Sequence, residues 1–201
     1  MIEACIEYLR RTSPLELIAA GLAIAYVLVA IRASPWCWPL AFMSSALYVY
    51  VFTGARLYMD GLLNVFFAAM AVYGWYQWRH GGPDRSALPI SHASLRVHVA
   101  VLSVVVALTL VSGMLLGRYT NQAWPYVDSF IAWASVATTW LAARKFLENW
   151  IYWVVIDALA VPVYVNRNLH STAVLFGMYV ALAIVGWASW RREYRLQGRL
   201  A

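Results

Sequence analysis

The sequence predicts an all-α integral membrane protein with seven transmembrane helices. Of its 201 residues, 63% are hydrophobic and only 12% are charged, whereas soluble domains average about 45–50% apolar and about 25% charged residues. A chain this short has too little interior to hide that much apolar surface from water. Its apolar residues form seven continuous runs, which excludes a transmembrane barrel because barrel strands alternate apolar and polar residues.

Each of the seven runs is long enough to cross a bilayer as a helix. About 20 apolar residues span the hydrocarbon core, and a helix satisfies every backbone polar group within such a segment. In chain order, the predicted spans are Leu15–Ile31, Trp36–Phe52, Leu57–Trp78, Val97–Leu116, Trp124–Ala143, Trp150–Val165 and Ala173–Trp190.

The segments between the runs are short and rich in turn-forming residues, with one exception. The short segments include Arg32–Pro35, Thr53–Arg56, Gly117–Thr120 and Asn166–Asn168. The exception is a linker from Arg79 to about Arg96, which contains Gly81-Gly82-Pro83. It divides a single transmembrane domain, residues 1–201, into a triplet over 14–80, a linker and helix over 81–117, and a second triplet over 122–191.

Lysine and arginine residues predict the orientation in the membrane. Seven spans place the N-terminus and alternate loops on one side. That side has Arg10, Arg11, Arg56, Arg118 and Arg167, and the other has Arg32, Arg79, Arg85, Arg96, Arg144, Lys145, Arg191, Arg192, Arg195 and Arg199. Because cytoplasmic loops carry the excess of positive charge, we expect the N-terminus outside and the C-terminus in the cytoplasm.

The two halves contain matching residues at a fixed separation. Leu57 and Gly74-Trp75-Tyr76-Gln77-Trp78 in the third span match Leu169 and Gly186-Trp187-Ala188-Ser189-Trp190 in the seventh, at an offset of 112 in residue number, which we call the repeat offset. The second and sixth spans match at an offset of 114, which pairs Trp36 with Trp150. An offset of three helices plus one linker helix predicts two parallel triplets in a 3+1+3 arrangement, like that of SWEET proteins.

One acidic residue lies in the middle of a predicted span. Asp157 is about halfway along the sixth span, and Trp150, Trp153 and Tyr164 share its helical face. Ionisable groups inside a membrane are costly and usually functional, and indole faces together with a carboxylate suit a flat cationic ring. The alternative is that the two tryptophans belong to an interfacial aromatic belt.

The third span has a second polar face, on which Asn64 lies. The Asn64 amide has donors and acceptors for a sugar hydroxyl or an amide, and it fits a helix-to-helix contact equally well. The predicted substrate-binding residues are Trp36, Asn64, Gln77, Trp150, Trp153 and Asp157.

Several other functions are excluded by what the sequence lacks. Cys5 and Cys37 have no paired spacing, so neither a disulfide nor a metal site is expected. The only lysine, Lys145, lies at the end of a span, which excludes a retinal protein. Because no catalytic pair or phosphate loop is present, we expect no enzyme activity and no cofactor. The positive charge follows from membrane orientation, so we expect the lipid bilayer and no nucleic acid as partner.

Four stretches of the sequence carry a family pattern. The longest is Arg144-Lys145-Phe146-Leu147-Glu148-Asn149-Trp150-Ile151-Tyr152-Trp153, followed by Asp157 and Tyr164. The others are Trp36-Cys37-Trp38-Pro39, Leu57-Tyr58-Met59-Asp60 and Tyr73-Gly74-Trp75-Tyr76-Gln77-Trp78. Together they resemble the signature regions of PnuC-type vitamin transporters, over about Pro14 to Trp190.

This resemblance implies facilitated diffusion of nicotinamide riboside, a precursor of NAD, across a bacterial inner membrane. A cytosolic kinase would then trap the vitamin as its phosphate. Related members carry thiamine, the first alternative, or riboflavin, which is larger and neutral and ranks third. Some members have Asn near the position of Asp157, which leaves the substrate open.

In the implied mechanism, Trp150 and Trp153 stack on the aromatic ring and Asp157 supplies the countercharge. Asn64 and Gln77 hydrogen-bond the ribose or carboxamide, and one triplet rocks against the other. A more distant alternative is a structural or assembly subunit of the membrane, in which Asp157 meets an arginine of a partner chain. The oligomeric state is left open, a homo-oligomer included.

Overall fold

The computed structural model describes residues 13–120, 123–167 and 170–200. Within these residues the chain folds into seven long α-helices and one short 3-10 turn. They are α2 (Pro14–Ile31), α3 (Cys37–Gly54), α4 (Tyr58–His80), the turn η1 (Pro83–Arg85), α5 (Leu95–Tyr119), α6 (Pro125–Ala143), α7 (Asn149–Asn166) and α8 (His170–Leu200). Each α-helix overlaps one predicted span, so the all-α class and the seven helices are confirmed. Outside the described residues lie Cys5, Arg10, Arg11, Asn168 and Leu169.

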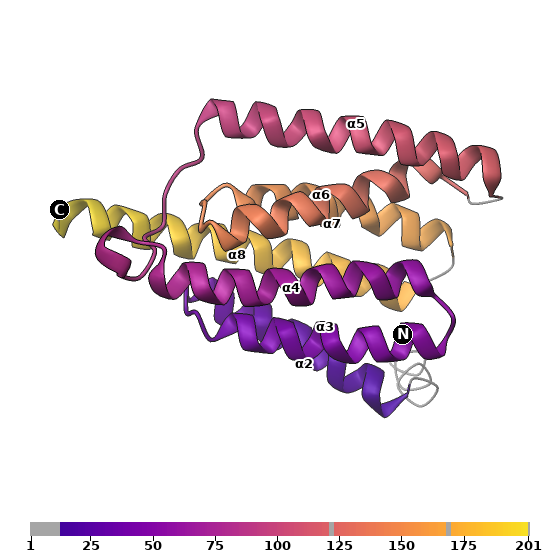
Figure 1. Ribbon diagram of the computed structural model, residues 1–201, viewed down its shortest axis with the longest axis horizontal. Coiled ribbons are helices and arrows are strands. Elements are labelled where there is room, and N and C mark those ends of the chain that lie inside the picture. The colour runs from indigo at the N-terminus through magenta and orange to yellow at the C-terminus, as the bar shows by residue number, and fades with distance from the viewer. Residues whose placement is uncertain (1–12, 121–122, 168–169, 201) are drawn as a thin grey trace.

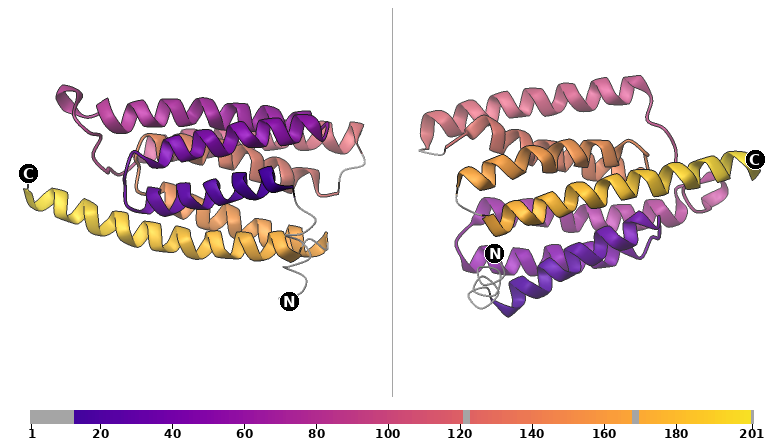
Figure 2. Two further views of the ribbon diagram at one scale, coloured as in Figure 1. Left: turned by 90° about the horizontal axis from the view of Figure 1, so that it is seen from below. Right: turned by 180° about the vertical axis from the view of Figure 1, so that it is seen from behind.

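The helices lie side by side in two groups, with α5 at one edge (Figure 1). In the first triplet α3 packs on α2 and α4, and in the second α7 packs on α6 and α8. The triplets meet where α4 packs on α6 and α2 packs on α8, while α5 packs on α6. The start of α2 and the end of α8 lie at opposite ends of the bundle (Figure 2), as an odd number of crossings requires. We call the end that has the α4–α5 linker and the end of α8 the linker end.

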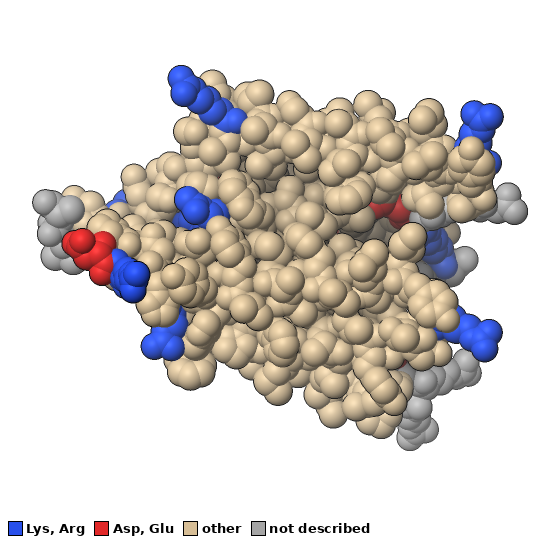
Figure 3. Space-filling model, in the orientation of Figure 1, with Lys and Arg blue, Asp and Glu red and all other residues tan. Residues whose placement is uncertain are grey.

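On the face shown in Figure 3, few charged side chains lie between the two ends of the bundle. Charged side chains gather toward the ends of the face in Figure 3, and uncharged residues cover the length between them. Among the described residues, four helical segments are long and apolar enough to cross a membrane: Pro14–Ile31, Cys37–Gly54, Leu95–Tyr119 and Thr172–Gly198. The helices α4, α6 and α7 have similar lengths, but polar residues such as Asn64, Thr138 and Asp157 lower their mean hydropathy.

Helix bounds recur along the chain at the repeat offset seen in the sequence. When the first triplet is shifted by this offset, α7 begins and ends at the positions of α3, α8 begins at the position of α4, and α6 ends at the position of α2. The turns that follow α2 and α6 also match: Ala33 has a φ of 51° and Lys145 a φ of 57°. Left-handed backbone is uncommon for residues other than glycine, so the matching turns extend the correspondence beyond the helix ends.

Two glycines allow a tryptophan ring to lie against the last helix of each triplet. A Cβ atom at Gly74 would lie 2.4 Å from the Trp38 ring, and one at Gly186 would lie 2.6 Å from the Trp150 ring. These contacts pair Trp38 with Trp150 at the same repeat offset that pairs the two glycines. The offset of 114, which pairs Trp36 with Trp150, is therefore corrected, and Trp36 is 65% exposed.

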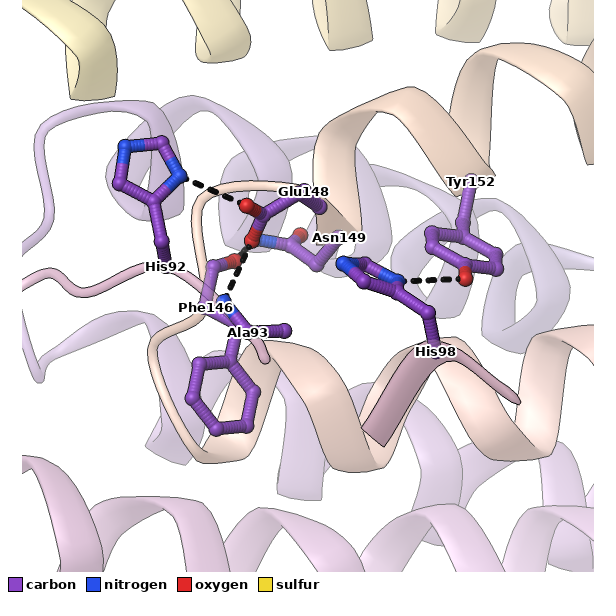
Figure 4. Close-up of polar contacts among 7 residues, drawn as sticks. All are labelled: His92, Ala93, His98, Phe146, Glu148, Asn149 and Tyr152. Atoms are coloured by element: carbon purple, nitrogen blue, oxygen red, sulfur yellow. Dashed lines mark hydrogen bonds and ion pairs between the residues drawn. The ribbon is translucent and has the colours of Figure 1, made fainter. Parts of the chain in front are cut away.

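The linker is fastened to the loop before α7. The Leu147 N–H donates to the Ser91 carbonyl over 2.9 Å. One oxygen of the Glu148 carboxylate accepts from the Ala93 N–H over 3.0 Å, and the other lies 2.7 Å from Nδ1 of His92 (Figure 4). Burial alone raises the pKa of Glu148, but the hydrogen bonds from Ala93 and His92 outweigh it and hold the pKa below its usual value.

A second contact joins the start of α5 to α7. Nδ1 of His98 lies 2.9 Å from the Tyr152 hydroxyl, and the two rings stack with their centroids 5.9 Å apart (Figure 4). The linker and the helix that follows it are thus both attached to the second triplet.

Substituting Gly186 with alanine tests the contact between glycine and tryptophan. We expect Gly186→Ala to lower the free energy of unfolding by about 1–3 kcal/mol, because the new methyl group overlaps the Trp150 ring. Gly177→Ala on the same helix is the matched control, since no atom lies within 4 Å of its Cβ position. Thermal unfolding of the detergent-purified protein measures both, and equal melting temperatures would contradict the close contact.

The Glu148 contacts predict a pH-dependent attachment of the linker. Because folding lowers the pKa of Glu148, its contribution to stability is complete above its unfolded pKa, which is about 4.3. That contribution is lost as the pH falls through the lower pKa of the folded state. We expect the protection of the linker amides against hydrogen exchange, relative to their intrinsic rates at each pH, to fall over this acidic range, and to be low in Glu148→Gln already at neutral pH. Glu193→Gln is the control, and the same acid response in Glu148→Gln as in the parent protein would refute the assignment.

Candidate functional site

A cavity of about 400 Å³ lies between the two triplets. Helices α2, α3, α4, α6, α7 and α8 contribute to its lining, whereas α5 contributes none of the described lining residues. Most of its wall is aliphatic or aromatic, and its aromatic and polar residues are Tyr26, Tyr48, Phe67, Trp78, Ser135, Asn149, Trp150, Trp153, Asp157, Phe176, Tyr179 and Trp190. An apolar cavity with a few polar groups is the usual form of a small-molecule site.

Two tryptophans close the cavity toward the linker end. The Trp78 Nε1–H donates to the Ala142 carbonyl over 3.0 Å, and the Trp190 Nε1–H donates to the Ala30 carbonyl over 2.9 Å. The centroids of the two indole rings are 5.5 Å apart. Both side chains are nearly fully buried, so the wall they form is tightly packed.

A buried lysine lies behind this wall. The Lys145 ammonium group lies 4.8 Å from the centroid of the Trp78 ring and donates to the Leu88 carbonyl over 2.9 Å. Lys145 belongs to the loop between α6 and α7, and burial lowers its pKa from the usual value. The lysine therefore joins the linker to the back of the tryptophan wall.

Asp157 is the acidic residue of the cavity lining. It is 6% exposed, and it makes no hydrogen bond or salt bridge with any residue in the described part of the chain. Removing an ionised carboxylate from water without a partner is costly. Such a group has a demand for compensation that no described residue meets by a hydrogen bond or salt bridge.

The other polar groups of the cavity are partly engaged with the protein. The Asn149 amide donates to the Phe146 carbonyl over 2.6 Å, and the Ser135 hydroxyl donates to the Ile131 carbonyl over 2.7 Å. Both bonds are local, so these side chains fix the walls near them. The Trp150 Nε1–H is buried without a hydrogen-bond partner among the described residues, so it and the Asp157 carboxylate are the two lining groups that stand out as unsatisfied.

Three of the six predicted binding residues line the cavity: Trp150, Trp153 and Asp157. The Trp150 ring lies on Gly186 and meets the Trp190 ring edge to face, with centroids 5.5 Å apart. One face of Trp150 is therefore covered by the protein. Trp153 is only partly buried, which leaves more of its ring available to a ligand.

The other three predicted residues do not line the cavity. The Asn64 amide donates to the Asp60 carbonyl on its own helix over 2.9 Å. The Gln77 side chain lies beside Gly81 at the end of α4. Trp36 is exposed at the start of α3 and packs edge to face on another indole.

Sequence reasoning missed three tyrosines of the cavity: Tyr26, Tyr48 and Tyr179. A signal for them exists, because each lies within a predicted apolar span, where a phenol group requires a polar partner or a wet surface. In the sequence, Trp78 and Trp190 are recognisable only as residues that match at the repeat offset. Their hydrogen bonds to the opposite triplet could not be read from the spacing.

The comparison with protein families identifies one matching family. The model of the nicotinamide mononucleotide transporter family matches residues 13–192. The chain is 25% identical over 188 residues to the riboflavin/roseoflavin transporter RibM of Streptomyces davaonensis, covering 92% of this chain and 87% of RibM. It is 27% identical over 176 residues to the nicotinamide riboside transporter PnuC of Escherichia coli K12, covering 75% of this chain and 74% of PnuC.

A solved structure shares the fold. The crystal structure of the vitamin B3 transporter PnuC superposes with a TM-score of 0.73 at 20% identity. The match covers 96% of this chain and 87% of the other, so the helical arrangement described above is shared along nearly the whole length.

Replacing Asp157 with asparagine tests the cost of its unpartnered carboxylate. We expect Asp157→Asn to raise the free energy of unfolding by about 1–2 kcal/mol in the absence of ligand, because functional sites are commonly built at the expense of stability. Thermal unfolding in detergent measures the change.

The contrasting variant is Asp128→Asn, since the Asp128 carboxylate accepts a 2.6 Å hydrogen bond from Arg167. That variant should lose about 0.5–1 kcal/mol. If both substitutions lowered the melting temperature equally, Asp157 would have a partner in the folded protein and the assignment would be wrong.

Proposed function

The chain belongs to the nicotinamide mononucleotide transporter family, and from this membership we propose that it carries nicotinamide riboside by facilitated diffusion. The family consists of membrane transporters, so the chain is a multi-pass transporter of a vitamin-class small molecule. This favours transport over the alternative of a structural subunit.

The observation that carries the choice of substrate is the isolated Asp157 carboxylate in an indole-lined cavity. Nicotinamide riboside is a cation with a flat aromatic ring. In a cavity that excludes water, a carboxylate and an indole face both attract such a ring more strongly than in solution. A volume of about 400 Å³ is within the range of small-ligand sites.

Trp153 is the proposed stacking surface for the ring. Trp150 is covered on one side by Gly186, so in this proposal it shapes the wall, while Asp157 faces the positive charge. In the same proposal the ribose is hydrogen-bonded by the hydroxyl groups of Tyr26, Tyr48 and Tyr179. Asn64, Gln77 and Trp36 lie outside the cavity lining, and contact with substrate would require them to move.

The transport cycle that we propose rests on a parallel 3+1+3 repeat. The first triplet (14–80) and the second (122–191) are related by the repeat offset, with the linker and helix (81–117) between them. This relation is supported by the helix bounds that coincide at the repeat offset and by the matching glycine–tryptophan contacts. Because the cavity lies between the triplets, rocking one against the other would expose it to each side in turn.

Two other vitamins are candidate substrates for the same cavity. The similarity to RibM over 92% of the chain favours riboflavin as a second candidate, although riboflavin is neutral and leaves the Asp157 carboxylate uncompensated. Thiamine is a cation with aromatic rings and satisfies the same argument as nicotinamide riboside.

In the cell we place the protein in the bacterial inner membrane, with its linker end in the cytoplasm. Arg32, Arg79 and Arg144 lie at or directly after helix ends there, and Arg191 lies in the part of α8 that leads to that end, as the positive-inside rule requires. Uptake would then be driven by a cytosolic kinase that phosphorylates the vitamin. A homo-oligomer is compatible with this arrangement.

The deciding experiment is calorimetric titration of the detergent-purified protein with nicotinamide riboside, thiamine and riboflavin. We expect nicotinamide riboside to bind, and Asp157→Asn and Trp153→Ala each to weaken it by about tenfold or more, equivalent to about 1.4 kcal/mol. Trp36→Ala is the matched control, because Trp36 is an exposed indole outside the cavity lining.

Each outcome of the titration has a distinct meaning. Binding of thiamine alone would keep the site and change the substrate. Binding of riboflavin alone, unaffected by Asp157→Asn, would overturn the cationic-ring proposal. Loss of binding in Trp36→Ala but not in Trp153→Ala would move the site away from the cavity.

A further inference from the structure

We infer that Trp78 and Trp190 form the gate that closes the cavity toward the linker end, through paired hydrogen bonds from each indole to the opposite triplet. This inference extends the proposed function from the site to the path that a substrate takes. It rests on transport by movement between the triplets, but not on the identity of the substrate.

The two hydrogen bonds both cross between the triplets. Trp78 on α4 donates to Ala142 on α6 over 3.0 Å, and Trp190 on α8 donates to Ala30 on α2 over 2.9 Å. The two donors are related by the repeat offset, and so are the two acceptors, so the second bond reproduces the first with the triplets exchanged. A pair of bonds arranged in this way holds both sides of the interface together.

The gate lies on the two packing contacts that join the triplets. These contacts are α4 with α6 and α2 with α8, and each contains one of the indole bonds. Rocking of the triplets about the cavity has to separate the helices of both contacts at one end. The indole bonds must therefore break when the linker end opens.

A row of four indole rings in contact forms the closed gate. Trp38 meets Trp78 with ring centroids 5.4 Å apart, Trp78 meets Trp190 at 5.5 Å, and Trp190 meets Trp150 at 5.5 Å. The outer two rings lie on Gly74 and Gly186. Since no described member of the row is more than 5% exposed, water and solutes are excluded while the row is intact.

The two halves of the gate are not held equally. The backbone of Trp78 accepts a 3.1 Å hydrogen bond from the Leu88 N–H of the linker, and its ring lies beneath the Lys145 ammonium group. The position that corresponds to Lys145 in the first triplet is Ala33, which has no charged group. We therefore expect the Trp190–Ala30 bond to open before the Trp78–Ala142 bond.

The test measures entry of a thiol reagent into the cavity from the linker side, without any substrate. A cysteine is placed in the cavity lining by Ser135→Cys, in a background with Cys5→Ser and Cys37→Ala. Vesicles are treated from outside with a membrane-impermeant maleimide, and vesicles whose linker end faces outward are identified by a parallel Ser86→Cys variant, since Ser86 is exposed in the linker.

Replacing both gate tryptophans with phenylalanine leaves an aromatic ring at each position and removes the indole N–H donor. We expect Trp78→Phe with Trp190→Phe to raise the labelling rate of Ser135→Cys from the linker side by about tenfold, because two hydrogen bonds no longer oppose opening. Trp190→Phe alone should raise the rate more than Trp78→Phe alone. Melting temperatures and gel-filtration profiles show whether each variant is folded.

The matched control is Trp75→Phe with Trp187→Phe. These tryptophans on α4 and α8 are also related by the repeat offset, but they lie beneath Arg79 and Arg191 at the surface. Their replacement should leave the labelling rate unchanged. An unchanged rate in the folded gate variant, or an equal rise in the control, would overturn the gate; neither result depends on whether nicotinamide riboside binds.

Discussion

Helices in a bilayer cannot associate by withdrawing apolar surface from water, so they depend on close packing and on hydrogen bonds between side chains and backbone. Here both come from tryptophan. The Trp38 and Trp150 rings occupy the space left by two glycines, and the Trp78 and Trp190 N–H groups satisfy carbonyls across the interface. The glycine contacts hold each triplet together, and the indole hydrogen bonds hold the two triplets together at one end. The cavity lies between the triplets, beyond these bonds.

The cavity contains one group that is costly to bury. The Asp157 carboxylate lies among aromatic side chains, without a hydrogen bond to the described protein. Such a group weakens the empty protein, and in the proposed function a cation that enters the cavity recovers the lost stabilisation. A flat cationic ring satisfies the carboxylate and the indole faces together, which neither a sugar nor an aliphatic cation does. In the proposed site, the electrostatics therefore restrict the substrate class more tightly than the shape of the cavity does.

Hydrophobic runs were sufficient to predict the helices, since lipid imposes nearly one secondary structure and one length. The predicted sixth span, Trp150–Val165, differs from α7 by one residue at each end. The site was predicted in part: Asp157 and Trp153 share a helical face and could be found from spacing. Asn64 also had the right spacing, but its amide turns back to its own helix. Which face of α4 meets the cavity depends on packing against α6, and periodicity within one helix does not contain that information.

Residues related by the repeat offset fall into two groups. Those of the gate are identical in the two halves, with tryptophan at 38 and 150 and at 78 and 190, and alanine at 30 and 142. Those around the carboxylate differ: Asp157, Asn149 and Trp153 correspond to Ser45, Cys37 and Ala41. The proposed gate uses one indole hydrogen bond from each triplet, which constrains both halves, whereas a small substrate needs only one set of binding groups. In the proposed transporter, a change of substrate preference would therefore require only a few substitutions in α7 and would leave the gate residues unchanged.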